Sequence, residues 1–258
     1  MEFRAWNKVR RRRALAAATL AALLVASLAL VDAAIASRTE RALSLQAVLR
    51  DNLPTAPDVY IGGFPFLAAV AADSVPAVRV SSLDVPVDGV GVVNASAEAF
   101  DVDIPGDKIL AADFTGGEAT LVRRKIRLDG VAFGALLGMT DLDIANPYDI
   151  SPRGGVASQA QLMGTVPDTD TPATVVVALR LTDGVFEMRP SKLVDVAPED
   201  TERVLDAFTL TFDTRDFPLG GPAGLVQLSG GSIEFSRDRM NVTLSPEDFT
   251  PLATPADL

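Results

Sequence analysis

Apolar and polar residues alternate strictly in several segments of this 258-residue chain. The clearest examples are residues 100–104, 175–181, 208–212 and 240–244. A period of two predicts strands with one buried and one solvated face. In the first example, Phe100, Val102 and Ile104 are expected to share the buried face. Across the chain the pattern predicts about nine or ten strands.

Turn residues separate the strands in the C-terminal third. Asp183-Gly184 and Gly230-Gly231 each lie between two alternating segments and predict hairpins, because such pairs favour tight turns. The polar residues 236–239 predict a third turn. This part of the chain is therefore expected to be a β-meander.

Helical signals are few. Residues 39–53, 65–72 and about 131–139 have the spacing or composition of helices, and 198–207 is a further candidate. The fold class is therefore α+β, dominated by antiparallel sheet. So few helices leave a long apolar sheet face to cover. The sheet can curl on itself, form a sandwich, or leave a groove for an apolar ligand.

The N-terminus has the pattern of a membrane segment. Six of the 23 basic residues lie in the first 13 positions, and residues 14–31 carry no charge. A span needs about 20 apolar residues, with the arginines remaining cytoplasmic. The segment 14–36 is either a signal peptide cut after Ala36 or an uncleaved transmembrane helix, and its length favours the latter.

These alternatives define the expected organisation. Residues 1–13 are a cytoplasmic basic segment, 14–36 the transmembrane helix or signal peptide, and 37–258 an extracytoplasmic domain. The anchored protein would be a single-pass protein of the inner, cytoplasmic membrane. The cleaved form would be secreted or periplasmic.

Composition excludes several classes of function. The chain has no Cys and no His, which removes thiolate nucleophiles, Cys/His zinc sites and the usual Ser-His-Asp triad. Residues 37–258 hold 17 basic and 32 acidic side chains, so nucleic acid is not an expected partner. We expect no enzyme activity, catalytic residue, cofactor or metal site.

Two segments are candidates for ligand contact. "GGFPFL" at 62–67 precedes an apolar helix, and it is either a turn leading into the core or an aromatic lip on an apolar pocket. "LVRRKIR" at 121–127 is the one dense basic run of the acidic domain. It is either a solvated strand face balanced by acids or a contact for the phosphate of a lipid head group, through Arg123 and Arg124.

Three blocks resemble a known family. They are "IGGFPFL" (61–67), "VPAVRVSSLDV" (75–85) and "DFPLGGPAGLVQLSGGSIEFSRDRMNVTL" (216–244). With the N-terminal membrane segment, they are similar to the LmeA-like phospholipid-binding proteins of actinobacterial cell envelopes. That resemblance implies a tubular lipid-binding fold, in which a strongly curved antiparallel sheet wraps around one or two helices and an apolar cavity.

The resemblance also implies a function. The protein would shield the acyl chains of a phospholipid or other acyl lipid in an apolar groove, and would carry lipid for envelope biogenesis. The residues expected to line the groove, the last three on periodicity alone, are Phe64, Pro65, Phe66, Leu67, Val70, Phe133, Leu136 and Leu137. The alternative is a non-enzymatic envelope scaffold whose β-core is packed solid.

Overall fold

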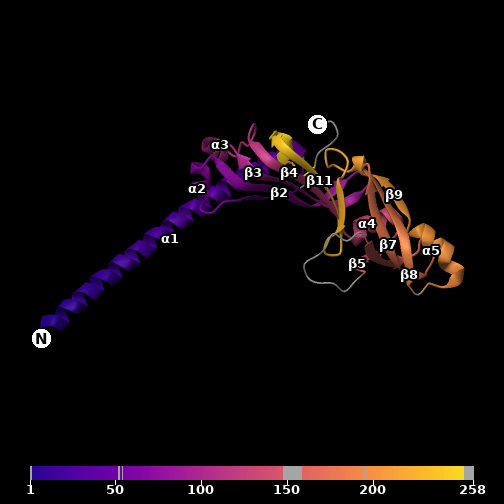
Figure 1. The fold of residues 1–258 in the computed structure, drawn as a ribbon, viewed down its shortest axis with the longest axis horizontal. Coiled ribbons are helices and arrows are strands. Elements are labelled where there is room, and N and C mark those ends of the chain that lie inside the picture. The colour runs from indigo at the N-terminus through magenta and orange to yellow at the C-terminus, as the bar shows by residue number, and fades with distance from the viewer. Residues whose placement is uncertain (1, 52, 54, 148–158, 195, 253–258) are drawn as a thin grey trace.

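The computed structural model describes residues 2–51, 53, 55–147, 159–194 and 196–252. They form an elongated body with a long helix projecting from one end (Figure 1). The body contains two open, antiparallel sheets. The larger has the order β1 (Asp58–Ile61), β2 (Ser74–Val87), β3 (Gly91–Asp103), β4 (Glu118–Leu128), β11 (Ile233–Thr243), β10 (Leu225–Leu228). The smaller has the order β5 (Asp143–Ala145), β6 (Gln159–Thr165), β7 (Pro172–Thr182), β8 (Val185–Val194), β9 (Leu210–Asp213).

Helices are short except for the first. They are α1 (Glu2–Asp51), α2 (Phe66–Ala71), α3 (Gly106–Leu110), α4 (Gly130–Leu137) and α5 (Thr201–Ala207). Three 3-10 turns are η1 (Pro198–Asp200), η2 (Thr214–Asp216) and η3 (Pro246–Phe249). The predicted α+β class with antiparallel sheet is confirmed. The strands divide into two sheets because α4 takes the chain out of the larger sheet after β4, and η2 brings it back before β10.

Helix α1 runs without a break for 50 residues. The separate helix expected at 39–53 is its C-terminal part. The sequence holds the reason, because neither Gly nor Pro occurs before Pro54. Beyond the apolar run, one face of α1 lies against the domain and buries Asp32, Thr39, Leu43 and Ala47.

Two of the predicted turns are confirmed and one is wrong. Asp183 and Gly184 connect β7 to β8, and the turn containing Gly230-Gly231 connects β10 to β11. The polar residues 236–239 form no turn. They lie inside β11, which pairs with β4 along its whole length, because the charged side chains alternate across the two faces of that strand.

The prediction that Phe100 shares a buried face with Val102 and Ile104 is wrong. Ala99 and Val102 are both buried, whereas Phe100 is half-buried. Asp101 has a φ of +48°, and Asn241 in β11 has a φ of +52°. This left-handed backbone, which Asp and Asn tolerate best, interrupts the alternation of faces at these positions.

The buried side chains form two clusters. One lies where α4 and the smaller sheet meet the larger sheet and includes Phe133, Phe186 and Phe235. The other lies beside the C-terminal part of α1 and includes Phe66 and Leu43. The larger sheet contributes to both clusters, and the buried Arg124 of β4 lies between Val122, which belongs to one cluster, and Ile126, which belongs to the other.

Candidate lipid-binding site

The eight apolar residues expected to line one groove lie in two places. Phe66 is buried in the cluster beside α1, and Phe133 in the cluster beside the smaller sheet. Val70 packs against the first cluster, and Leu136 and Leu137 against the second. Phe64, Pro65 and Leu67 are exposed. The set therefore does not form one wall.

Phe64 and Leu67 flank the entry to α2, at the end of the body from which α1 leaves (Figure 1). Phe64 is 86% exposed and Leu67 is 39% exposed. The chain turns sharply before them: Gly62 donates to the carbonyl oxygen of Ala77 at 2.7 Å, and Gly63 has a φ of +107°. Phe66 anchors the helix in the core, and its neighbours therefore point outward. We call Phe64 and Leu67 the apolar tip.

Asp32 of α1 holds the apolar tip in place. One carboxylate oxygen accepts a hydrogen bond from the backbone N–H of Phe66 at 2.9 Å, and the other accepts from Leu67 at 2.8 Å. Free N–H groups at the start of a helix favour such an anion. The carboxyl group is also buried, with Asp32 only 6% exposed. Asp32 therefore connects α1 to the start of α2 through two hydrogen bonds.

The two predicted head-group arginines point to opposite faces of β4. Arg123 makes a two-fold contact with Asp238, through Nε at 2.7 Å and Nη2 at 2.6 Å. That hydrogen-bonded pairing raises the pKa of Arg123 and lowers the pKa of Asp238. Arg124 is buried on the inner face and donates to the carbonyl oxygen of Glu247. Because they lie on opposite faces of β4, the two arginines cannot bind the same phosphate group.

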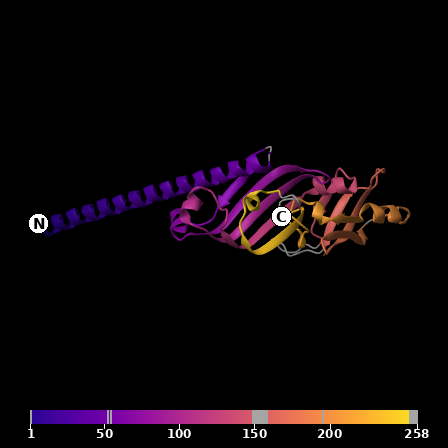
Figure 2. The same ribbon diagram turned by 90° about the horizontal axis from the view of Figure 1, so that it is seen from above.

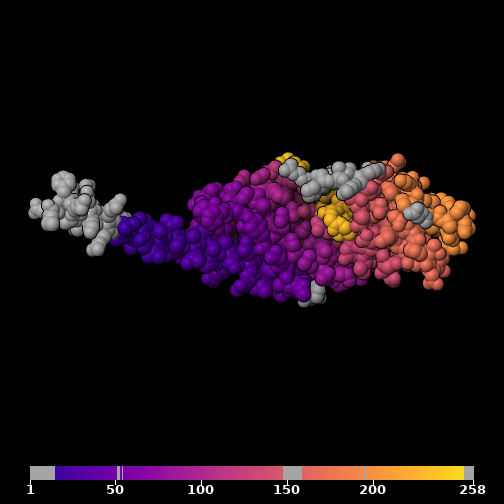
Figure 3. Space-filling model, turned by 90° about the horizontal axis from the view of Figure 1, so that it is seen from below, coloured from indigo at the N-terminus to yellow at the C-terminus, as the bar shows by residue number. Residues whose placement is uncertain are grey.

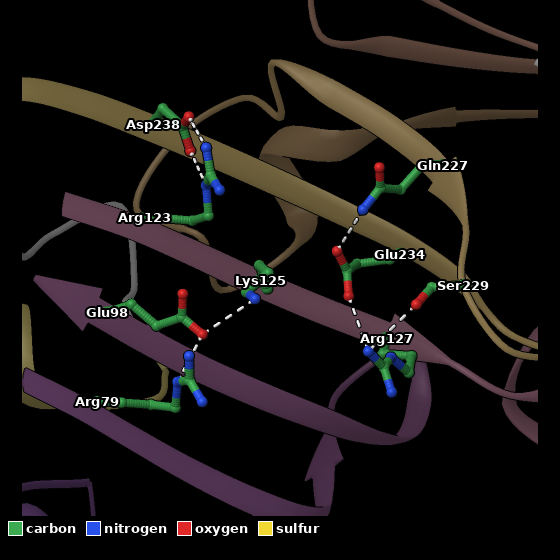
Figure 4. A network of polar contacts seen from close by, with 9 residues as sticks. All are labelled: Arg79, Glu98, Arg123, Lys125, Arg127, Gln227, Ser229, Glu234 and Asp238. Carbon is green, nitrogen blue, oxygen red and sulfur yellow. Dashed lines mark hydrogen bonds and ion pairs between the residues drawn. The ribbon is translucent and has the colours of Figure 1, made fainter. Parts of the chain in front are cut away.

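The other cations of the basic run are balanced by acids on the outer face (Figure 4). Glu98 accepts from Lys125 at 3.0 Å and from Arg79 at 2.9 Å. Arg127 contacts Glu234 at 3.1 Å. These pairs cross strands β2, β3, β4 and β11 and match the reading of this run as a solvated strand face balanced by acids.

The inner face carries a different arrangement of arginines. Arg237 of β11 lies directly opposite Arg124 of β4, and Arg239 is two residues further along β11. Like charges opposite one another are unfavourable unless something neutralises them. Arg239 is paired with Asp248, and Arg124 has the carbonyl of Glu247.

No described residue forms a hydrogen bond or an ion pair with the guanidinium of Arg237, which is half-buried. Burial lowers its pKa, and its positive charge contributes to lowering the pKa of Arg239. The group also lies close to Gly221, where a Cβ would come within 2.7 Å of the guanidinium carbon. A glycine at 221 is therefore what leaves room for it.

Arg237 borders a cleft of about 600 Å³ between the two sheets. The β7–β8 turn forms one side, with Asp183 and Gly184, and the start of β10 forms the other. Apolar walls come from Leu181, Pro222, Ala223 and Leu225. We call this the junction cleft. It has the size and mixed lining of a small-ligand site.

Arg215 is the second cation in the junction cleft, but it is already engaged. Its Nη1 contacts both carboxylate oxygens of Asp213, at 3.1 and 3.2 Å, and its Nη2 donates to the carbonyl oxygen of Asp183 at 3.1 Å. Of the two cations that line the cleft, Arg237 is therefore the one without a partner in the described part of the chain. Among the described residues, no three acidic side chains gather in a way that could hold a metal ion.

Sequence reasoning missed Asp32 and Arg237. Asp32 stood out only as a single charge at the end of an apolar run, and Arg237 fell within the supposed polar turn. A sequence signal existed for Arg237: residues 233–243 can be read as one strand, which places Arg237 and Arg239 on a single face. No local pattern pairs Asp32 with residues 66 and 67.

A family model described as LmeA-like phospholipid-binding matches residues 30–236. That range covers most of the chain. The protein belongs to the LmeA-like phospholipid-binding family. No curated protein matches the chain, and no solved structure does. The predicted resemblance is thus confirmed by the family match alone.

The first and last residues of the LmeA-like match show which features lie inside the family region. It begins at Leu30, so the family region includes Asp32 and the whole docked part of α1. It spans the apolar tip and all strands up to Ser236 in β11, one residue before Arg237. The family supports lipid binding as the protein's activity, and α1 is long and apolar enough to cross a membrane.

Proposed function

We propose that the protein is a membrane-tethered phospholipid-binding protein of the cell envelope, with the lipid phosphate held by Arg237 in the junction cleft. The observation that carries this is the half-buried guanidinium of Arg237, which has no partner among the described residues, in a protein of a phospholipid-binding family. A charge that is partly shielded from water and has no partner is unfavourable, and a bound anion reduces that cost. Arginine offers phosphate a planar fork of donors.

The lipid contacts expected from the sequence change accordingly. We transfer the head-group role from Arg123 and Arg124 to Arg237, because the first two arginines have protein partners. Phe66 and Phe133 act as core residues in this proposal, since protein surrounds both. Leu181 and Leu225 supply the apolar contact for the part of the lipid next to the phosphate. A lipid held there is lifted out of the bilayer, which is what carrying requires.

We also propose that α1 remains attached as an anchor in the inner membrane, with the domain on its outer side. Cleavage after Ala36 would remove Asp32 and leave the N–H groups of Phe66 and Leu67 without their acceptor. Within the apolar run, Thr19 and Ser27 donate to carbonyl oxygens one turn earlier, so both hydroxyls are satisfied inside the helix.

Photocrosslinking of the full-length protein tests the lipid site. The protein is reconstituted in vesicles containing a phospholipid with a photoreactive group near its head, and labelled peptides are mapped by mass spectrometry. We expect labels on residues 181–184 and 222–225. Arg237→Gln should lose most of them, because the phosphate contact is gone. Arg203→Gln, a change to an exposed arginine of α5, should keep them.

The scaffold alternative gives a different result. Phe66 and Phe133 inside filled clusters are consistent with a scaffold. In that case labels would appear along α1, where any membrane helix meets lipid, and the junction cleft would stay unlabelled in all three proteins. That outcome would overturn the proposed lipid site.

A further inference from the structure

The height of the apolar tip relative to the bilayer follows from α1. Residues 14–31 extend about 27 Å at 1.5 Å per residue, close to the roughly 30 Å of a hydrocarbon core. Asp32 is the next residue, and its carboxylate contacts the first turn of α2. The start of α2 is therefore level with the end of the apolar run.

The connection between helix and domain is rigid enough to fix that height. Besides Asp32, Glu40 accepts from the N–H of Ile61 at 3.0 Å, and Ser44 donates to the carbonyl of Pro57 at 2.7 Å. These contacts follow one another along the face of α1 that meets the domain. The exposed apolar part of α1 projects from this end of the body, as the space-filling view shows (Figure 3).

Packing within the domain does not explain why the side chains at the tip are apolar. Phe66 already supplies the buried anchor of α2, and Phe64 adds no packing to either core. Other apolar side chains are exposed elsewhere, such as Leu205 on α5 with 39%. Single exposed apolar residues are ordinary. What distinguishes Phe64 and Leu67 is their position beside the last turn of the membrane segment.

We propose that the apolar tip inserts into the outer interface of the same bilayer that holds α1. Phe and Leu side chains that project from a membrane-facing helix bury at this boundary, where they contact acyl chains just below the head groups. Arg38 and Arg41 are exposed on α1 within about 15 Å of the end of the apolar run, at the depth of anionic head groups. The domain is thereby docked on the membrane at two points and keeps one orientation relative to it.

Depth-dependent quenching of tryptophan fluorescence tests the docking. Trp6 is the single tryptophan of the chain and is replaced by Phe. Into this background we introduce Phe64→Trp, Leu67→Trp or, as the control, Leu205→Trp. Leu67 and Leu205 are equally exposed at 39%, and α5 lies at the opposite end of the body (Figure 2). The full-length proteins are reconstituted in phosphatidylcholine–phosphatidylglycerol vesicles containing lipid brominated near the head-group end of its chains.

We expect severalfold stronger quenching at positions 64 and 67 than at 205, with blue-shifted emission at the first two. Equal quenching at all three positions would overturn the proposal. So would quenching at 64 that disappears when the protein is diluted in the membrane, since that would show a second copy covering the tip. Thermal unfolding of each variant confirms that the exposed substitutions leave the fold intact.

This inference is separate from the lipid site. The quenching is repeated with Arg237→Gln, which removes the proposed phosphate contact but leaves the tip unchanged. Unchanged quenching there is expected, because docking depends on α1 and α2 alone. Loss of quenching in that variant would contradict the proposal by making the tip's insertion depend on bound lipid.

Discussion

One carboxylate, that of Asp32, connects the long apolar helix α1 to the folded domain. From the sequence alone Asp32 is a lone charge directly after 18 uncharged positions, and such a charge is unfavourable to bury without a partner. In the structure it gains two backbone N–H donors in a buried setting. Hydrogen bonds to an ionised acceptor are about twice as strong as neutral ones. Arg237 is the converse case, a charge for which the described residues supply no partner.

Replacing Asp32 tests whether its carboxylate caps α2. Asp32→Ala leaves one buried and one part-buried N–H group without an acceptor, and the loss of a helix cap typically costs about 1–2 kcal/mol. We expect the amides of Phe66 and Leu67 to exchange with deuterium faster in the full-length protein. Asp32→Asn keeps one acceptor oxygen and should have an intermediate effect. Asp88→Ala, at an exposed turn, serves as the control. Unchanged exchange in Asp32→Ala would contradict the capping role.

At the scale of elements, α4 shows how a short helix divides the chain between two sheets. Asp129 begins it by accepting from the N–H of Ala132 at 2.9 Å, and Gly138 ends it with a φ of +71°. Phe133 fills the space between the sheets. Gly130 lies so close to the following chain that a Cβ would come within 2.1 Å of the carbonyl oxygen of Leu142. This contact sets the angle at which the chain enters the smaller sheet.

Gly130→Ala should therefore destabilise the domain. Alanine gains up to about 1 kcal/mol in helix propensity, but a backbone clash of this size cannot be relieved by a side-chain rotation. Overpacking typically costs about 1–3 kcal/mol, and we expect the clash to outweigh the propensity. The measurement is the urea concentration at the midpoint of unfolding, compared between variants that have the same m value. Gly224→Ala, whose Cβ has its nearest neighbour at 4.0 Å, should change it little. A Gly130→Ala midpoint equal to the wild-type value would refute the argument.

On the scale of the whole molecule, a continuous α1 joins the apolar N-terminal segment to the domain without a linker. Its 50 residues extend about 75 Å, with the arginine cluster at one end and the docked face at the other. A flexible linker would let the domain turn freely over the membrane. In the membrane arrangement that we propose, the continuous helix instead keeps the apolar tip at the membrane side, and the junction cleft further along the body.

The mature N-terminus tests this arrangement. We expect the protein isolated from native membranes to keep the residues before Ser37, because Asp32 belongs to the folded domain. Intact mass measurement, together with N-terminal peptide mapping, decides the question. A protein that begins at Ser37 would contradict the anchor, and the docking of the tip along with it.

The sequence alone determined the local features. Alternation identified antiparallel strands, Asp183-Gly184 and Gly230-Gly231 marked hairpins, and an uncharged run after arginines indicated a membrane segment. These follow from short-range periodicity and turn chemistry, which a single segment contains. The tertiary structure decided which charges meet. Asp32 reaches a helix more than thirty residues away, and Arg237 has no partner among the described residues because Glu247 and Asp248 contact its neighbours Arg124 and Arg239. Such pairings depend on how distant segments come together, and no local pattern records that.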